Sequence, residues 1–203
     1  MTLMRFAPVA ALLPVLMLAL AAPAWAEKIP LAQLSAYLNG LTTAEAAFTQ
    51  VNADGSKSTG KLYLKRPGRM RFEYSDDKTL VLASGGQVAI FDPKSNQIAE
   101  QYPLKRTPLN LILAERIDLA QARMVVGHEA EGANTVVVAQ DPQTPEYGTI
   151  RLVFSANPVT LRRWVITDDT GAKTVVILDQ LKPGADPGAR MFSIVAETEA
   201  RKR

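Results

Sequence analysis

The chain has 203 residues, carries a formal net charge of +3 and contains no cysteine. The small net charge gives no electrostatic reason to expect a highly charged partner. The absence of cysteine excludes disulfide bonds, and it also excludes the lipid-modified cysteine that a bacterial lipoprotein carries at its mature N-terminus.

The first 26 residues have the three parts of a secretory signal peptide. Arg5 is followed by an apolar run from Phe6 to Ala22 and then by the small-x-small sequence Ala24-Trp25-Ala26. Prolines interrupt the run, which favours cleavage over an uncleaved membrane anchor. We therefore expect residues 1–26 to be a signal peptide and residues 27–203 to form one soluble domain, a length that can bury a substantial core.

Two amphipathic helices are predicted, one over residues 30–41 and a shorter one over residues 107–115. The first helix has apolar residues at helical spacing, which are Leu31, Leu34, Leu38 and Leu41. The second helix is expected to have Thr107 as its N-cap and Pro108 in its first turn. Its buried stripe would consist of Leu109, Ile112 and Leu113. Residues 117–122 are a candidate for a further helical turn.

Apolar residues that alternate with polar ones predict about ten antiparallel strands. Between Gly60 and Asp92, four such runs are separated by turn sequences, so they should fold back as a meander. Other strands are expected over residues 44–53, 95–103, 123–129, 135–140, 149–155, 161–167, 174–181 and 191–195. Residues 201–203 are expected to be a frayed tail. A single sheet this wide tends to curl, and the two helices could cover its concave face.

The alternation also separates an apolar face of the meander from a basic one. Leu62, Leu64, Met70, Phe72 and Tyr74 share one face, while Lys61, Arg69 and Arg71 point the other way. Basic residues interleaved with aromatics can form a groove for single-stranded nucleic acid, but stacking needs both on the same exposed face. A solvated outer face is therefore favoured, and docking of a protein partner there is a weaker possibility.

The sequence offers little support for catalysis or metal binding. His128 is the only histidine, and no serine stands in a G-x-S-x-G turn. One histidine without cysteine does not make a typical metal site. Asp76-Asp77 and Asp168-Asp169 lie in turn sequences, where aspartate bonds its own backbone. We expect no enzyme activity, no cofactor and no metal.

Several short motifs follow one another in a fixed order and spacing, from the first helix to the second. These motifs are Phe48-Thr49-Gln50, Gly60-x-Leu62, Lys65-Arg66-Pro67, Phe72, Ser84-Gly85-Gly86, Phe91-Asp92-Pro93, Asn96-Gln97-Ile98 and Thr107-Pro108. In these motifs the chain resembles the LolA family of periplasmic lipoprotein carriers.

The resemblance implies an incomplete antiparallel β-barrel of about ten to eleven strands, closed by a helical lid over an apolar cavity. It implies a soluble periplasmic protein that takes acylated lipoproteins from the inner-membrane Lol ABC transporter to a LolB-like receptor in the outer membrane; we expect it to act as a monomer. The family's lid-latching arginine falls on Arg66, and its partner region falls near Leu38.

From the alternation and the resemblance together, we expect one set of residues to line the acyl-chain cavity. The set is Leu34, Leu38, Leu41, Phe48, Leu62, Leu64, Met70, Phe72, Tyr74, Leu109, Ile112 and Leu113. The interior should be hollow enough for an alkyl chain. A carrier of another lipid, such as a glycolipid or hopanoid, and a module that senses mislocalised lipoproteins stay open as alternatives, and an exported hydrolase is a weaker third.

Overall fold

The computed structural model describes residues 27–95, 98–121 and 123–202, so the predicted signal peptide lies outside the described residues. Within them, eleven strands form one antiparallel sheet in the order β6-β5-β4-β3-β2-β1-β11-β10-β9-β8-β7. The strands are β1 (Thr43–Val51), β2 (Lys57–Lys65), β3 (Arg69–Tyr74), β4 (Leu80–Ser84), β5 (Gln87–Phe91), β6 (Glu100–Pro103), β7 (Val125–Glu131), β8 (Asn134–Gln140), β9 (Thr149–Ser155), β10 (Thr160–Thr167) and β11 (Lys173–Pro183). The mainly β fold and its helical cover were predicted, and both are confirmed.

The sheet curls without closing, because its edge strands β6 and β7 do not pair with each other. The two halves of the chain meet where β1 pairs with β11, with Phe48 opposite Leu178. Bulges interrupt the register between Glu45 and Ala47, between Leu161 and Arg163, and between Val125 and Gly127. Bulges increase local twist and bend, which suits a curled sheet.

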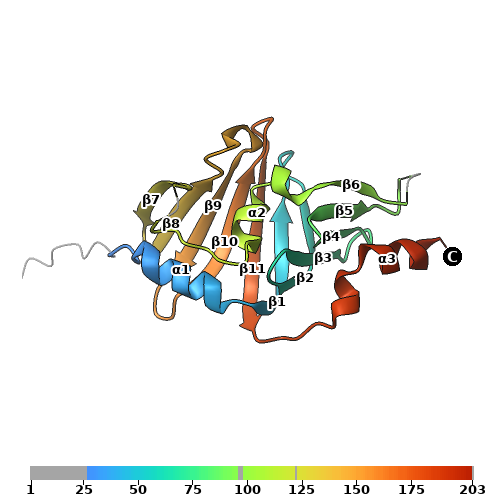
Figure 1. Ribbon diagram of the computed structural model, residues 1–203, viewed down its shortest axis with the longest axis horizontal. Helices are drawn as coiled ribbons and strands as arrows, with labels where there is room; N and C mark the ends of the chain where they lie inside the picture. The colour runs from blue at the N-terminus through green and yellow to red at the C-terminus, as the bar shows by residue number, and fades with distance from the viewer. Residues whose placement is uncertain (1–26, 96–97, 122, 203) are drawn as a thin grey trace, which may run out of the picture.

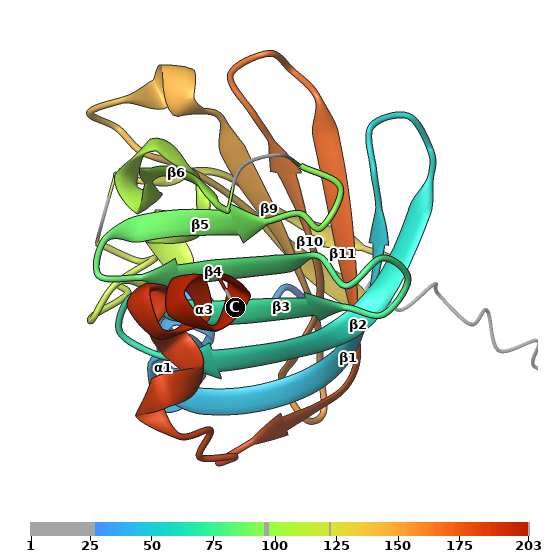
Figure 2. The ribbon, with the colours of Figure 1, turned by 90° about the vertical axis from the view of Figure 1, so that its right-hand side faces the viewer.

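Three α-helices cover the two faces of the sheet: α1 (Leu31–Gly40), α2 (Leu109–Leu113) and α3 (Ile194–Arg201). Short 3₁₀ turns occur at η1 (Leu104–Arg106), η2 (Pro145–Tyr147) and η3 (Ala189–Phe192). Figure 1 shows α1 and α2 inside the curve of the sheet, and Figure 2 shows α3 on its outer side over β3 and β4. Each face of the sheet therefore has its own cover.

Five local predictions are wrong. Residues 191–195 are not a strand, because the 3₁₀ turn η3 and α3 occupy that stretch, and Arg201 ends α3 instead of fraying. Residues 117–121 contain no helix. Thr107 does not cap α2, since its hydroxyl donates to the Leu104 carbonyl. Strand β6 is limited to Glu100–Pro103, and Ile98, expected as its main apolar residue, is exposed.

Candidate functional site

The inner face of the sheet, α1 and α2 enclose one apolar cluster. Leu34 and Leu38 of α1 are almost fully buried in it, and Ile112 and Leu113 of α2 also belong to it. All the residues predicted to line a cavity lie here: ten are buried, whereas Tyr74 and Leu109 are partly buried and pack against the others. Leu111 of α2 is also buried, although the predicted stripe of that helix omitted it. The role of these residues in holding lipid stays a prediction.

Four aromatic rings lie together in this inner cluster. Phe48 packs edge-on against Phe72 and Tyr74, with ring centroids 5.3 and 5.2 Å apart, and Trp164 meets Phe72 at 6.4 Å. The hydroxyl of Tyr74 donates to Oε1 of Gln50 at 2.7 Å. Burial, only partly offset by this hydrogen bond, raises the pKa of Tyr74 to about 12. The ring is therefore neutral at physiological pH.

One apolar cavity inside the cluster has a volume of about 20 Å³, enough for about one water molecule. Its lining residues are Leu38, Leu41, Leu62, Leu64, Arg66, Met70, Ile112, Leu161, Trp164, Leu178 and Leu181. The sequence predicted an interior hollow enough for an alkyl chain, and this prediction is wrong for the closed arrangement of the lid. An alkyl chain fits only if the cover moves.

Four of the lining residues come from β10 and β11 and were not predicted, namely Leu161, Trp164, Leu178 and Leu181. Alternation along β11 could have indicated Leu178, since it and Val176 are both buried. The bulge between Leu161 and Arg163 explains why simple alternation does not relate Leu161 to Trp164.

Arg66 lies in the turn between β2 and β3 and fastens the inner cover. Its guanidinium donates to the main-chain carbonyls of Leu38 in α1 and of Ala114 and Glu115 just beyond α2. It also lies 3.4 Å from Oδ1 of Asn39. Burial lowers the pKa of Arg66, but an arginine stays cationic at any physiological pH. The structure therefore brings Arg66 and Leu38 together, as the resemblance implied.

The two parts of the inner cover are also tied to each other. Asn39 donates to the Ile117 carbonyl at 2.7 Å and accepts from the Ile117 amide at 2.9 Å. The Ser35 hydroxyl accepts from the Leu119 amide at 2.8 Å. Helix α1 and the segment 114–119 thus form one unit that Arg66 holds, and we call this unit the lid.

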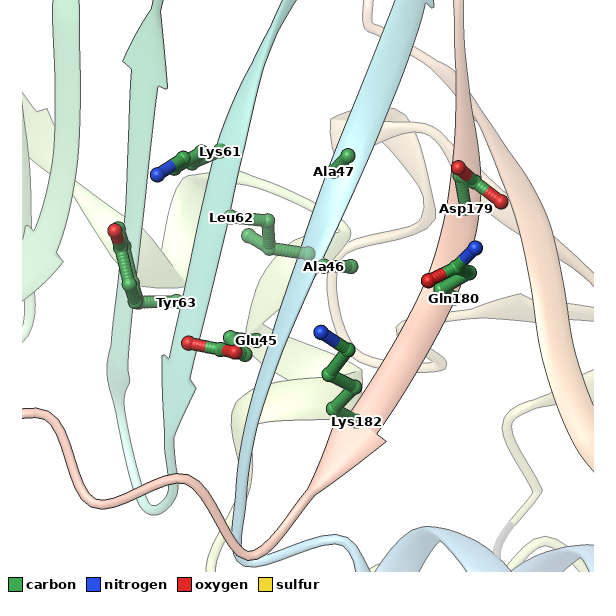
Figure 3. Close-up of a pocket in the computed structure, with 9 residues that line it drawn as sticks. All are labelled: Glu45, Ala46, Ala47, Lys61, Leu62, Tyr63, Asp179, Gln180 and Lys182. Carbon is green, nitrogen blue, oxygen red and sulfur yellow. The ribbon is translucent and has the colours of Figure 1, made fainter.

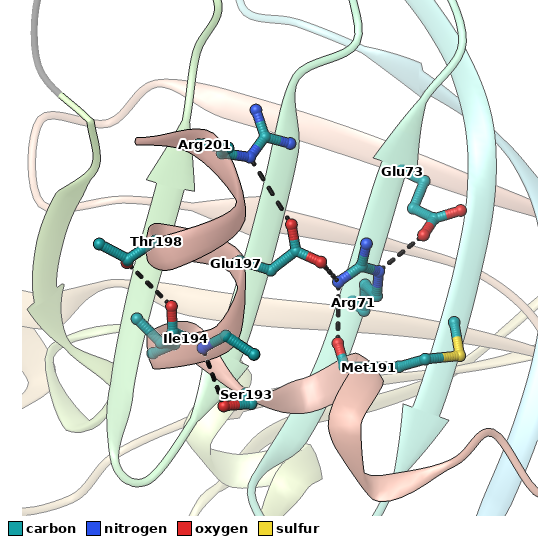
Figure 4. Close-up of polar contacts among 9 residues, drawn as sticks. Arg71, Glu73, Met191, Ser193, Ile194, Glu197, Thr198 and Arg201 are labelled. Atoms are coloured by element: carbon teal, nitrogen blue, oxygen red, sulfur yellow. Dashed lines mark hydrogen bonds and ion pairs between the residues drawn. The ribbon is translucent and has the colours of Figure 1, made fainter. Parts of the chain in front are cut away.

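The outer face has a separate apolar cluster under the C-terminal segment. Leu80, Leu82, Ala89, Phe91 and Phe192 are buried in it. At its edge, Arg71 of β3 bonds Oε1 of Glu73 at 2.7 Å, Oε1 of Glu197 at 2.8 Å and the Met191 carbonyl at 2.8 Å, as Figure 4 shows. The guanidinium of Arg201 lies 5.0 Å from the centroid of the Phe91 ring.

The prediction of a solvated basic face is therefore wrong for Arg71. It is only 9% exposed, whereas Lys61 is exposed and Arg69 is half-buried. Burial lowers the pKa of Arg71, but hydrogen bonds to Glu197 and Glu73 outweigh it, so the pKa is raised overall. A nucleic-acid groove has no support at this position, because the cation is covered by the chain itself.

A second concavity, of about 270 Å³, opens on the sheet where β1, β2 and β11 meet (Figure 3). It lies at the bulge opposite Ala46, where Gln180 has a positive φ of 46°. Charged side chains of both signs line it, including Glu45, Lys61 and Lys182. Such walls are a poor environment for an alkyl chain, because entry of the chain would desolvate these charges. The inner cavity is the better candidate site.

Three of the polar residues singled out from the sequence, His128, Asp77 and Asp168, have structural partners. Nε2 of His128 lies 3.0 Å from the Ile29 carbonyl. Asp77 and Asp168 each accept hydrogen bonds from backbone amides two residues further on, which confirms the turn interpretation. Across the described residues, no three His, Cys, Asp or Glu side chains are grouped to hold a metal ion. In the same part of the chain, no helix has the length and apolar character needed to cross a membrane.

Comparison with known proteins agrees with this geometry. Residues 39–195 match the family model described as outer membrane lipoprotein carrier protein LolA. The outer-membrane lipoprotein carrier protein of Pseudomonas aeruginosa PAO1 is 29% identical to this chain, over 79% of this chain and 81% of that protein. The outer-membrane lipoprotein carrier protein of Coxiella burnetii CbuK_Q154 is 25% identical, over 79% of this chain and 80% of that protein. A solved domain from Vibrio parahaemolyticus, assigned to outer membrane lipoprotein sorting, has the same fold, with a TM-score of 0.50 and 11% identity over 83% of this chain and 97% of that domain. Because the match to the family model covers more than half of the chain, the chain belongs to the LolA family.

Proposed function

We propose that this protein is a periplasmic carrier that binds the acyl chains of lipoproteins beneath its lid and shuttles them from an inner-membrane ABC transporter to a LolB-like outer-membrane receptor. The proposal includes export by residues 1–26 and a soluble, monomeric mature chain. The observation that supports it best is a lid of two segments held over an apolar interior by one arginine, Arg66.

The energetics of lipid transfer indicate why such a protein needs an apolar interior. Each buried acyl methylene contributes about 0.8 kcal/mol, so a chain of roughly 16 carbons resists leaving a membrane by on the order of 10 kcal/mol. A carrier must offset most of that free energy with apolar surface of its own. The inner cluster supplies such surface from both halves of the sheet and from the lid.

The cavity of about 20 Å³ requires the lid to open before cargo can enter. Opening exposes apolar side chains such as Leu38 and Ile112, and an alkyl chain can cover them again. The bonds of Arg66 are different, because no part of an alkyl chain replaces them. A charged donor bound to carbonyls stabilises the closed lid by about 1.5–3 kcal/mol. Closure therefore competes with cargo and favours release to the receptor.

Replacement of Arg66 by leucine tests this proposal. We expect Arg66→Leu to fold, to load lipoprotein and to release it to the receptor at least about tenfold more slowly, since the closed state loses roughly 1.5–3 kcal/mol of stabilisation. Arg69→Leu removes a nearby arginine that is outside the lid, so it is the matched control. Normal transfer by Arg66→Leu would remove Arg66 from the mechanism.

Mass spectrometry of the ligand that co-purifies from the periplasm tests the choice of cargo. A triacylated protein supports the lipoprotein carrier. A free glycolipid or hopanoid would instead support a carrier of another lipid with the same lid.

A further inference from the structure

Trp164 has a polar atom that the fold leaves without a partner. The side chain is 1% exposed, and its Nε1 has no hydrogen-bond acceptor among the described residues. A buried indole N–H usually finds a partner, because an unmet buried donor costs free energy. This donor therefore calls for an explanation.

Two other aromatic side chains of the inner cluster have their polar atoms paired. The Tyr74 hydroxyl donates to Gln50, and the Tyr37 hydroxyl accepts from the Leu161 amide at 3.0 Å. The ring that packs against Trp164 is that of Phe72, which needs no partner. A phenylalanine at position 164 would also place an aromatic ring in the core, without an unpaired N–H.

Trp164 also lines the inner cavity, and the chemistry of that cavity is one-sided. Nine of its eleven lining residues are leucine, isoleucine or methionine, and the other two are Trp164 and Arg66. Indole and guanidinium groups donate hydrogen bonds and cannot accept them. No carboxylate, hydroxyl or amide side chain lines this space. A carbonyl oxygen attached to an alkyl chain is the complementary group, because it accepts without donating.

We propose that Nε1 of Trp164 donates a hydrogen bond to the carbonyl oxygen of an acyl ester or amide group of the cargo. The inference rests on the proposed carrier function and adds a determinant of specificity to it. The aliphatic walls would take any alkyl chain of suitable length, whereas the indole distinguishes an acyl chain from an alkyl ether.

Two lipids that differ by one carbonyl group test this inference: 1-palmitoylglycerol and 1-O-hexadecylglycerol. One hydrogen bond corresponds to about tenfold in affinity at most. We expect the unmodified chain to bind the ester about five- to tenfold more tightly, by competition with a fluorescent lipid. Trp164→Phe should bind both lipids equally. Circular dichroism and urea unfolding check that the variant folds.

The sequence offers a second readout that needs no change at the site. Trp25 and Trp164 are the only tryptophans, so a full chain carrying Trp25→Phe has a single indole. In ¹⁵N-labelled protein, we expect the indole N–H resonance of Trp164 to move downfield with the ester and much less with the ether.

The outcomes separate the two proposals. Equal binding of both lipids by the unmodified chain, an unmoved indole resonance, or an ester preference that survives in Trp164→Phe would each overturn the role of Trp164 while leaving a lipid carrier intact. Failure of the unmodified chain to bind either lipid would overturn both. If Trp164→Phe does not fold, the indole resonance decides alone.

Discussion

Two arginines of one hairpin fasten covers on opposite faces of the same sheet, and they do so with different acceptors. Arg66, in the β2–β3 turn, holds the lid on the inner face through main-chain carbonyls. Arg71, in β3, holds the C-terminal segment on the outer face through Glu73, Glu197 and one carbonyl. Among the ion pairs of the described residues, Arg71 has two carboxylate partners and Arg66 has none.

The difference in acceptors separates a cover that can open from one that stays. Carbonyls released by Arg66 can bond water when the lid lifts, so opening strands no buried charge. Removing Arg71 would leave Glu73 without its cation and Glu197 with only the more distant Arg201, at a partly buried site, which is destabilising. The outer cover therefore behaves as part of the fixed fold, while the inner cover is suited to exchange with a ligand.

The apolar contacts of the two covers strengthen this contrast. Leu34, Leu38 and Leu41, in and just after α1, are at least 95% buried on the inner side. An alkyl chain can replace the sheet as the apolar partner of these leucines. Helix α3 has no buried residue of its own, and Phe192, just before it, supplies the apolar anchor. Polar bonds to Arg71 therefore matter more for α3 than for α1.

The largest expected effect is on stability, from Arg71→Leu. It leaves Glu73 without its cation and Glu197 with only Arg201 as a partner, and it loosens η3 and α3. We therefore expect the free energy of unfolding to fall by about 3 kcal/mol. Urea unfolding measures this change, and lipid loading should be nearly normal. Arg69→Leu, on the same strand, should change stability by less than about 0.5 kcal/mol. Equal effects of the two substitutions would contradict a holding role for Arg71.

A smaller effect is expected from Asn39→Ala, which unties the two parts of the lid. The loss of two hydrogen bonds to Ile117 should weaken the closed lid by about 2 kcal/mol. The initial rate of uptake of a fluorescent lipid should rise about tenfold or more. Gln33→Ala, at an exposed position of α1, is the control. An unchanged rate would show that the lid does not need Asn39 to stay shut.

The smallest effect concerns pH and the inner face. The folded pKa of Tyr74, about 12, lies above the ordinary value of 10, so its contribution is complete below pH 10 and is lost as the pH rises through 12. The loss amounts to about 1.4 kcal/mol of unfolding free energy by pH 11. Tyr74→Phe should show a shallower fall in stability between pH 9 and 11. An identical fall would mean that Tyr74 is not shielded in solution.

The period-two alternation of apolar residues was sufficient to predict the sheet, because the apolar inner face continues from one strand to the next. Met70, Phe72 and Tyr74 alternate with Arg69 and Arg71, and the structure places the two sets on opposite faces. The same alternation could not show that Arg71 is buried, since its partner Glu197 lies 126 positions away along the chain. Only the folded chain brings them together.

The C-terminal segment was mispredicted for a local reason. Five residues with Met191, Phe192 and Ile194 fit a short strand as well as a helix start, and periodicity cannot separate them. Ser193 was the missed signal, because its Oγ accepts from the Ala196 amide at 3.1 Å and caps α3. The cavity residues of β10 were missed because a bulge displaces the alternation there.

Hydrogen exchange of the full chain, with and without bound acylated lipoprotein, tests most directly whether the lid opens for cargo while the outer cover stays closed. We expect loading to speed exchange of the amides of Ile117 and Leu119, whose acceptors are Asn39 and Ser35 of α1, and to leave α3 unchanged. Unchanged exchange at the lid, or faster exchange confined to α3, would contradict this account.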